Sequence, residues 1–104
     1  MKYHHIGIPT DIPRENETYL PEYKVFVSGY ETSLYGEEWM RYEPDSPVPE
    51  LVKSVPHIAF EVDSVSEAIK GKEILIKPNS QSEGTLVAFI IENGAPIEFL
   101  QIKK

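Results

Sequence analysis

Apolar runs of strand length, separated by proline, glycine and polar residues, recur along the whole chain. Valine, isoleucine and aromatic residues in these runs favour strands over helices. The pattern predicts strands at 4–9, 23–28, 38–43, 56–62, 73–77, 85–92 and 95–102. The run at 85–92 is apolar on both faces, so we expect it to be a central strand. Asn93-Gly94, which follows it, is a favoured two-residue hairpin turn.

Helices are predicted to be few and short. Residues 63–70 begin with a possible serine cap, carry an acid three residues after Ser64 and end at Gly71. Residues 14–20 allow a short helix between two prolines, and residues 50–54 allow a single turn after a proline-rich linker. Isolated helices of this length are marginal, so the strands should dominate.

One short pattern occurs twice, half a chain length apart. In His5–Ile8 and in His57–Phe60, histidine and isoleucine are followed by a small residue and then a large apolar one. Because side chains alternate along a strand, each histidine shares a face with its small neighbour, which leaves room beside it. The predicted fold class is α+β, one domain over 1–104. A shortened first module, 1–49, and a second module, 55–104, should join their sheets into one curved layer.

Composition narrows the function classes. The 104 residues include 17 acids and 10 bases, which gives a net charge of −7. This charge argues against nucleic acid and against an anionic membrane as partners. There is no cysteine, so no thiolate can bind a metal. No apolar run has the length of a membrane span, and we expect a cytoplasmic protein with a small-molecule substrate.

An acid interrupts the apolar run of the last predicted strand. Glu98 lies between Ile97 and Phe99. A buried carboxylate without a partner is expensive, so Glu98 should face a polar cavity or an exposed edge. Glu38 has the matching place in the first half, because residues 38–41 resemble residues 98–101.

Two histidines and two glutamates therefore occupy matching places in the two halves. Two imidazoles and two carboxylates, from His5, Glu38, His57 and Glu98, suit a divalent ion such as Zn, Ni, Co, Mn or Fe(II). Four protein ligands in a six-coordinate shell leave open positions for substrate oxygens. Glu43 is a rival to Glu38 and lies on the opposite face of the same strand.

Three further residues are candidates for a substrate pocket. Arg41 could bind a carboxylate or phosphate, although a surface salt bridge is its simpler role. Tyr35 and Phe89 could line a pocket, although aromatic residues on strands usually belong to the core.

Several motifs keep a fixed order and spacing, namely His5–Pro9, His57–Asp63, Val87–Phe89 and Asn93–Glu98. Together they resemble the vicinal oxygen chelate superfamily, also called the glyoxalase/bleomycin resistance/dioxygenase fold. The chain is most similar in appearance to the methylmalonyl-CoA epimerase and glyoxalase I branches.

The resemblance implies paired βαβββ modules that curl around a cavity and a metal bound by His5, Glu38, His57 and Glu98. It implies a metal-dependent lyase, isomerase or epimerase that acts on a small oxo or hydroxy compound through an enediolate or enolate. Glu98 and Glu38 would then be the catalytic residues that move a proton. Members are commonly homodimers, and a chain this small gains core by pairing.

The chain departs from this family pattern in the first half, which is expected to lack a strand or most of a helix. Glu37 stands where an apolar residue usually precedes the ligand glutamate, and the loop at 78–84 is short. A CoA ester or glutathione has few basic contacts here. The alternative function is therefore a metal-free module that binds a small molecule, as in drug-sequestering members of the fold.

Overall fold

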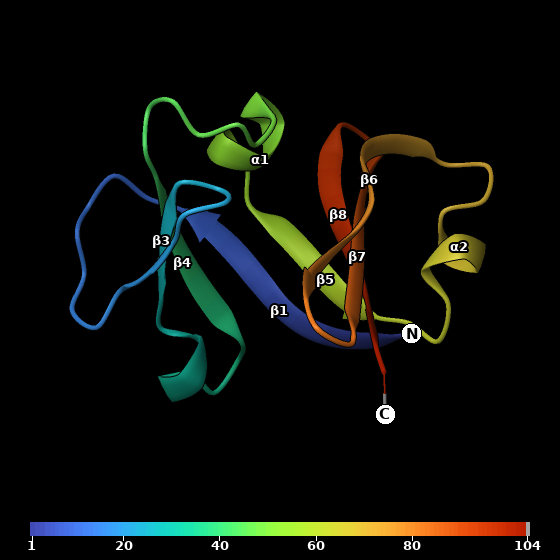
Figure 1. The fold of residues 1–104 in the computed structure, drawn as a ribbon, viewed down its shortest axis with the longest axis horizontal. Coiled ribbons are helices and arrows are strands. Elements are labelled where there is room, and N and C mark those ends of the chain that lie inside the picture. Colours follow the sequence, from blue (N-terminus) through green and yellow to red (C-terminus); the bar gives the residue numbers. More distant parts are fainter. Residues whose placement is uncertain (104) are drawn as a thin grey trace.

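A single mixed sheet, curled into a half-barrel, makes up most of the computed structural model (Figure 1). The structure describes residues 1–103, apart from the side chains of residues 81 and 82. The strands are β1 (Lys2–Pro9), β2 (Thr18–Leu20), β3 (Val25–Ser28), β4 (Glu37–Tyr42), β5 (His57–Glu61), β6 (Glu73–Ser82), β7 (Thr85–Glu92) and β8 (Ala95–Ile102). The helices are η1 (Tyr30–Thr32), α1 (Glu50–Ser54) and α2 (Val65–Ala68).

The two halves of the sheet have the same internal order. Across the sheet the strands run β2-β3-β4-β1-β5-β8-β7-β6. In each half the first strand is parallel to the fourth, β1 with β4 and β5 with β8, and β1 joins β5 in antiparallel pairing. Figure 1 shows β3 and β4 in one arm and β6, β7 and β8 in the other, with β1 and β5 crossing between them. This arrangement confirms the predicted α+β fold with a curled mixed sheet.

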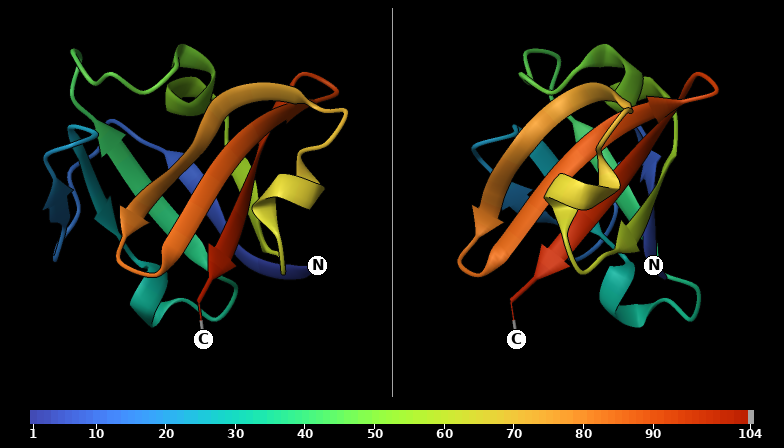
Figure 2. Two further views of the ribbon diagram at one scale, coloured as in Figure 1. Left: turned by 45° about the vertical axis from the view of Figure 1, so that its right-hand side comes forward. Right: turned by 90° about the vertical axis from the view of Figure 1, so that its right-hand side faces the viewer.

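The apolar core lies mainly in the second half. Val65 of α2 packs with Ala88, Ile90 and Phe99 on the outer face of the sheet. Figure 2 shows α2 covering that face of β7 and β8. On the other face of β7, Val87 is also completely buried, so β7 is covered on both sides as its continuous apolar sequence predicts.

The predicted helix at 63–70 is present in a shorter form as α2. The Ser64 side chain accepts a hydrogen bond from the Glu67 backbone N–H at 3.2 Å, which is the expected cap. Within residues 1–103, no helix has the length and apolar character needed to cross a membrane.

Two segments differ from their sequence-based prediction. Residues 14–20, predicted as a short helix, form a loop followed by β2, and the left-handed backbone of Asn16 (φ 61°) is incompatible with a helix there. In the described chain the first half therefore has all four strands and lacks the helix between β1 and β2. Strand β6 continues beyond 77, with irregular pairing between Ile76 and Asn79 where Pro78 has no N–H to donate.

The β7–β8 hairpin turns at Asn93 and Gly94, which have φ of 52° and 77°. An alanine side chain at Gly94 meets no atom within 4 Å, so the left-handed backbone is its only expected cost. Gly94→Ala should lower the free energy of unfolding by about 1 kcal/mol. Asn93→Gly, the matched control, should leave it equal or higher. Urea unfolding measures both variants, and a Gly94→Ala protein as stable as the parent contradicts this explanation of the turn.

Candidate metal centre

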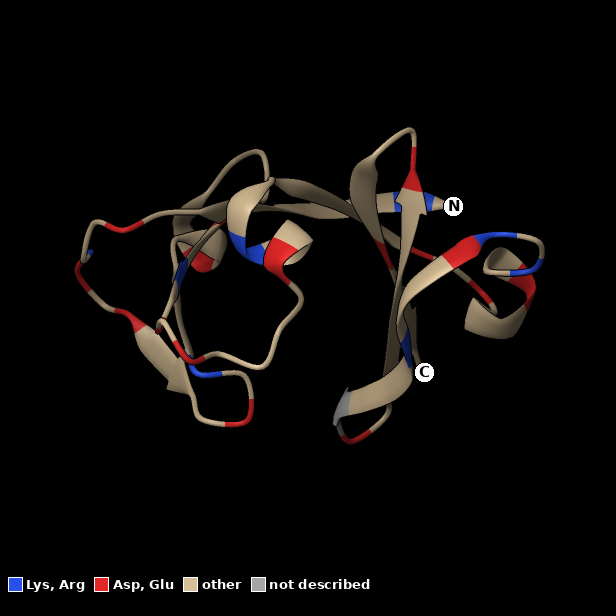
Figure 3. Cartoon of the chain, turned by 90° about the horizontal axis from the view of Figure 1, so that it is seen from above, with Lys and Arg blue, Asp and Glu red and all other residues tan. Residues whose placement is uncertain are grey.

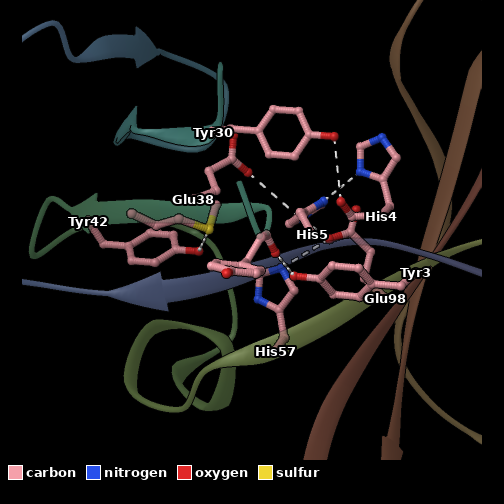
Figure 4. Close-up of polar contacts among 10 residues, drawn as sticks. Tyr3, His4, His5, Tyr30, Glu38, Tyr42, His57 and Glu98 are labelled. Carbon is pink, nitrogen blue, oxygen red and sulfur yellow. Dashed lines mark hydrogen bonds and ion pairs between the residues drawn. The ribbon is translucent and has the colours of Figure 1, made fainter. Parts of the chain in front are cut away.

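The two repeated histidines face each other because of the register between β1 and β5. In this antiparallel pair, His5 lies opposite Ala59 and Gly7 lies opposite His57. Each histidine therefore has a small residue as its neighbour across the strand pair. The two imidazole rings meet edge to face, with centroids 5.7 Å apart (Figure 4).

Gly7 leaves the space that the His57 ring fills. A Cβ atom at Gly7 would lie 2.2 Å from Cε1 of His57 and within 2.8 Å of both ring nitrogens. The sequence pattern predicts room beside each histidine. At Gly7 that room is taken by the other half's histidine itself, so a glycine is required for the two rings to approach.

Glu98 joins the histidines from the neighbouring strand β8, where it pairs with Ala59. Its Oε1 atom lies 3.0 Å from Nε2 of His57 and 3.4 Å from Nε2 of His5. Glu98, His57 and His5 are only 4%, 1% and 6% exposed, respectively. Their ligand atoms all lie within 4.8 Å of one another, so this buried cluster could hold a metal ion.

The electrostatics of the cluster centre on the Glu98 carboxylate. Burial raises its pKa, but the polar contacts and positive charge of His5 and His57 outweigh burial and hold the pKa well below its usual range. For His5, burial lowers the pKa, whereas the hydrogen bond and charge of Glu98 raise it overall, with a smaller contribution from Glu38. The carboxylate is therefore anionic and compensated by its neighbours.

Glu38 lies at the margin of the cluster. It pairs with Gly7 from strand β4, and its Oε1 atom is 3.7 Å from Nε2 of His5. Burial raises the Glu38 pKa, and His5 only partly opposes this shift. The structure thus brings all four candidate ligands to one face of the sheet, three of them tightly and Glu38 more loosely.

Glu43, the rival acid, lies elsewhere. Its carboxylate accepts a hydrogen bond from the hydroxyl of Tyr19 at the exposed end of the first arm.

His4 is a neighbour of the cluster that sequence reasoning missed. Its Nδ1 atom lies 2.8 Å from Nδ1 of His5, so one ring donates a hydrogen bond to the other. The His4 ring also stacks on Tyr30, with centroids 5.4 Å apart (Figure 4). These contacts fix the orientation of His5 and leave its Nε2 atom toward Glu98. The His-His doublet was the only sequence signal for this role.

A cavity of about 340 Å³ opens from the cluster, and His5, Glu38 and Glu98 are part of its wall. Phe89, predicted as a pocket residue, also lines it and contacts the His57 ring at a centroid distance of 5.0 Å. Tyr42 lies in the same wall, and burial raises its pKa far above the usual value, so its hydroxyl stays protonated.

The other two predicted pocket residues lie outside this cavity. Arg41 occupies the opposite face of β4 from Glu38, because the two positions differ by an odd number. Its guanidinium makes two hydrogen bonds to Glu17, of 2.9 and 2.7 Å, so its role is the simpler salt bridge. Tyr35 is 75% exposed in the loop before β4.

Comparison with known proteins identifies the fold. No family model and no curated protein matches this chain. A solved structure of a hypothetical protein from Bacillus halodurans is 22% identical, with a TM-score of 0.74 over 99% of this chain and 95% of that chain. Methylmalonyl-CoA epimerase from Mycobacterium tuberculosis is 13% identical, with a TM-score of 0.61 over 99% of this chain and 89% of that chain. These likenesses confirm the vicinal oxygen chelate fold.

The contact between Gly7 and His57 predicts a steric cost. Gly7→Ala should lower the free energy of unfolding by about 1–3 kcal/mol, because the new methyl group overlaps the His57 ring. His57→Ala in the same chain removes the obstacle, so the double variant should lose less stability than the sum of the two single variants. Urea unfolding of the four proteins measures this coupling. Strict additivity would show that the ring does not depend on the glycine.

Proposed function

We propose that this protein binds one divalent metal ion through His5, His57 and Glu98, with Glu38 as a fourth ligand. We further propose that it is a lyase, isomerase or epimerase for a small oxo or hydroxy compound. The observation that carries the proposal is the buried His5–His57–Glu98 cluster, of which His5 and Glu98 line a cavity. The fold shared with an epimerase adds support by analogy only, because one fold hosts many reactions.

The donor atoms fit a first-row divalent ion. Two imidazole nitrogens and one or two carboxylates suit Zn, Ni, Co, Mn or Fe(II). In addition, neither ring nitrogen of His57 has a hydrogen-bond partner of good geometry among the described residues, although both are buried. An ion within reach of Nε2 would satisfy one of these two buried nitrogens.

The two glutamates can perform the proton transfer that such reactions need. A bound divalent ion would stabilise the negative charge that develops on a carbonyl oxygen. A carboxylate oxygen accepts the proton from the carbon beside the carbonyl, and the C–H electron pair moves into the enolate or enediolate. Return of the proton to the neighbouring carbon isomerises the compound, and return to the opposite face epimerises it. Glu98 is held between two histidines, so the less constrained Glu38 is our first choice for this transfer.

A metal-free binding module is the second candidate, and one observation favours it. The Glu98 carboxylate lies 3.0 and 3.4 Å from the imidazoles of His57 and His5, and protonated imidazoles would compensate its charge without a metal ion. In that case a ligand should stabilise the protein in the presence of a chelator. Homodimer formation and a cytoplasmic location stay predictions.

Metal content gives the first test. Untagged protein prepared without chelator should contain about one divalent ion per chain by mass spectrometry, and the His57→Ala/Glu98→Ala variant should contain none. Glu38→Gln should weaken binding at least tenfold, whereas Glu43→Gln, the matched acid outside the cluster, should not change it. Parent protein that stays free of metal after incubation with Ni, Co, Mn and Zn contradicts the proposed function.

Proton transfer gives the second test. In D₂O, metal-loaded protein should exchange the hydrogen beside the carbonyl of small 2-hydroxy ketones, seen as loss of that signal by proton NMR. Glu38→Gln should slow exchange by about 10²-fold or more, because the proton acceptor is removed. Glu43→Gln should exchange at the parent rate. Exchange no faster than in a solution of the same metal ion would exclude this chemistry for the ketones tested.

A further inference from the structure

The cavity beside the proposed metal cluster has no lysine or arginine in its described wall, and the basic side chains that line it there are His4 and His5, at the cluster end. Its acidic members are the two glutamates, Glu38 and Glu98. In Figure 3 the basic residues are scattered along the described ribbon rather than gathered in one place. An anionic group of a ligand that lies away from these histidines would therefore have no lysine or arginine in the described wall to compensate it.

Five cations adjoin wall residues in sequence, namely Lys24, Arg41, Lys53, Lys77 and Lys103. Lys24 is paired with Asp45, and Lys77 and Lys103 are exposed. Lys53 follows the wall residue Val52, but its ammonium group donates to the Ser46 carbonyl at 3.2 Å. Arg41 follows Met40, but it points to the other face of the sheet and binds Glu17 in two hydrogen bonds. Recruiting either side chain to a ligand would break contacts that the fold already makes.

The rest of the wall is largely apolar and comes from both halves of the sheet. Val25, Val27 and Met40 line it from the first arm, and Ile76 and Leu100 line it from the second. The volume of about 340 Å³ is within the usual range of small-molecule sites. A body of that size can be aliphatic or aromatic.

Polar groups concentrate at the metal-cluster end. The His5 and Glu98 side chains lie there, and Figure 4 shows the Tyr42 hydroxyl directed toward them. This hydroxyl is 3.6 Å from the sulfur of Met40, a weak acceptor, so it retains the capacity to donate to a ligand oxygen. The wall also includes three other polar side chains, those of Tyr23, Asn79 and Thr85. The cavity therefore has its carboxylates and histidines at the cluster end and a mostly apolar wall elsewhere.

We propose that this cavity selects a small uncharged ligand. Two adjacent oxygens lie at the His5–Glu98 end, and an aliphatic or aryl body lies against the apolar wall. A carboxylate or phosphate at the far end of that body is disfavoured, because burying an anion against apolar side chains without a lysine or arginine is unfavourable. The placement of the oxygens rests on the proposed function, whereas the charge selection rests on the wall alone.

Two probes of similar length test the charge selection. These are 1-hydroxyoctan-2-one, which is neutral, and 7-hydroxy-6-oxoheptanoate, which ends in a carboxylate. Titration calorimetry measures both on the parent protein, once loaded with Zn or Ni and once treated with EDTA. We expect the neutral ketone to bind at least tenfold more tightly than the carboxylate in both preparations.

A pair of charge variants tests whether the probes bind in this cavity. Ile76→Lys places an ammonium group in the wall and should raise the affinity for the carboxylate at least tenfold. Ile74→Lys adds the same charge to the same strand outside the wall and should leave that affinity unchanged. If Ile76→Lys does not fold, the comparison of the two probes on the parent protein still decides the inference.

The outcomes separate this inference from the proposed function. A parent protein that binds no metal but still prefers the neutral ketone contradicts the proposed function and supports the charge selection. A parent protein that binds metal, and that binds the carboxylate as tightly as the ketone, supports the proposed function and contradicts the charge selection. Absence of binding for both probes in both preparations also overturns the inference.

Discussion

The buried carboxylate of Glu98 sets the strongest constraint on this structure. An anion that is 4% exposed is stable only with compensating partners, and here these are the imidazoles of His5 and His57. The three residues lie on three neighbouring strands, β1, β5 and β8, so their contacts require one particular register across the junction of the two halves. The fold and the site are therefore specified by the same pairings, and each half supplies groups that the other needs.

Small side chains make this register compatible with dense packing. The His57 ring occupies the volume in which a side chain at Gly7 would lie, and Ala59 separates His5 from Glu98 in one row across the sheet. A shift of one residue between β1 and β5 would send one histidine to the opposite face. The larger apolar cluster lies under α2, away from this junction, whereas a smaller cluster of Ala59, Val87 and Leu100 lies directly beside it.

The sequence predicted what depends on strand periodicity. Alternation placed His5 and His57 beside small residues, and the parity of positions 38 and 43 already put Glu43 opposite Glu38. It did not predict what depends on local backbone geometry: the left-handed Asn16 replaces a short helix by a loop, and the irregular pairing around Pro78 extends β6. The contact between His4 and His5 was also missed, because neighbours in a strand normally face opposite sides.

Among proteins that share this fold, the residues that line the cavity, rather than the fold itself, determine which ligand is bound. The proposed metal site of two histidines and one or two glutamates would bind the oxygens of many compounds in the same way, so it could not by itself discriminate among them. Discrimination must come from groups that make the binding of a wrong ligand unfavourable. A buried charge without a compensating partner has this effect. In this chain the described wall carries carboxylates, two histidines and apolar groups but no lysine or arginine. In our proposal, the negative charge that would help to bind a metal ion would therefore also disfavour anionic ligands.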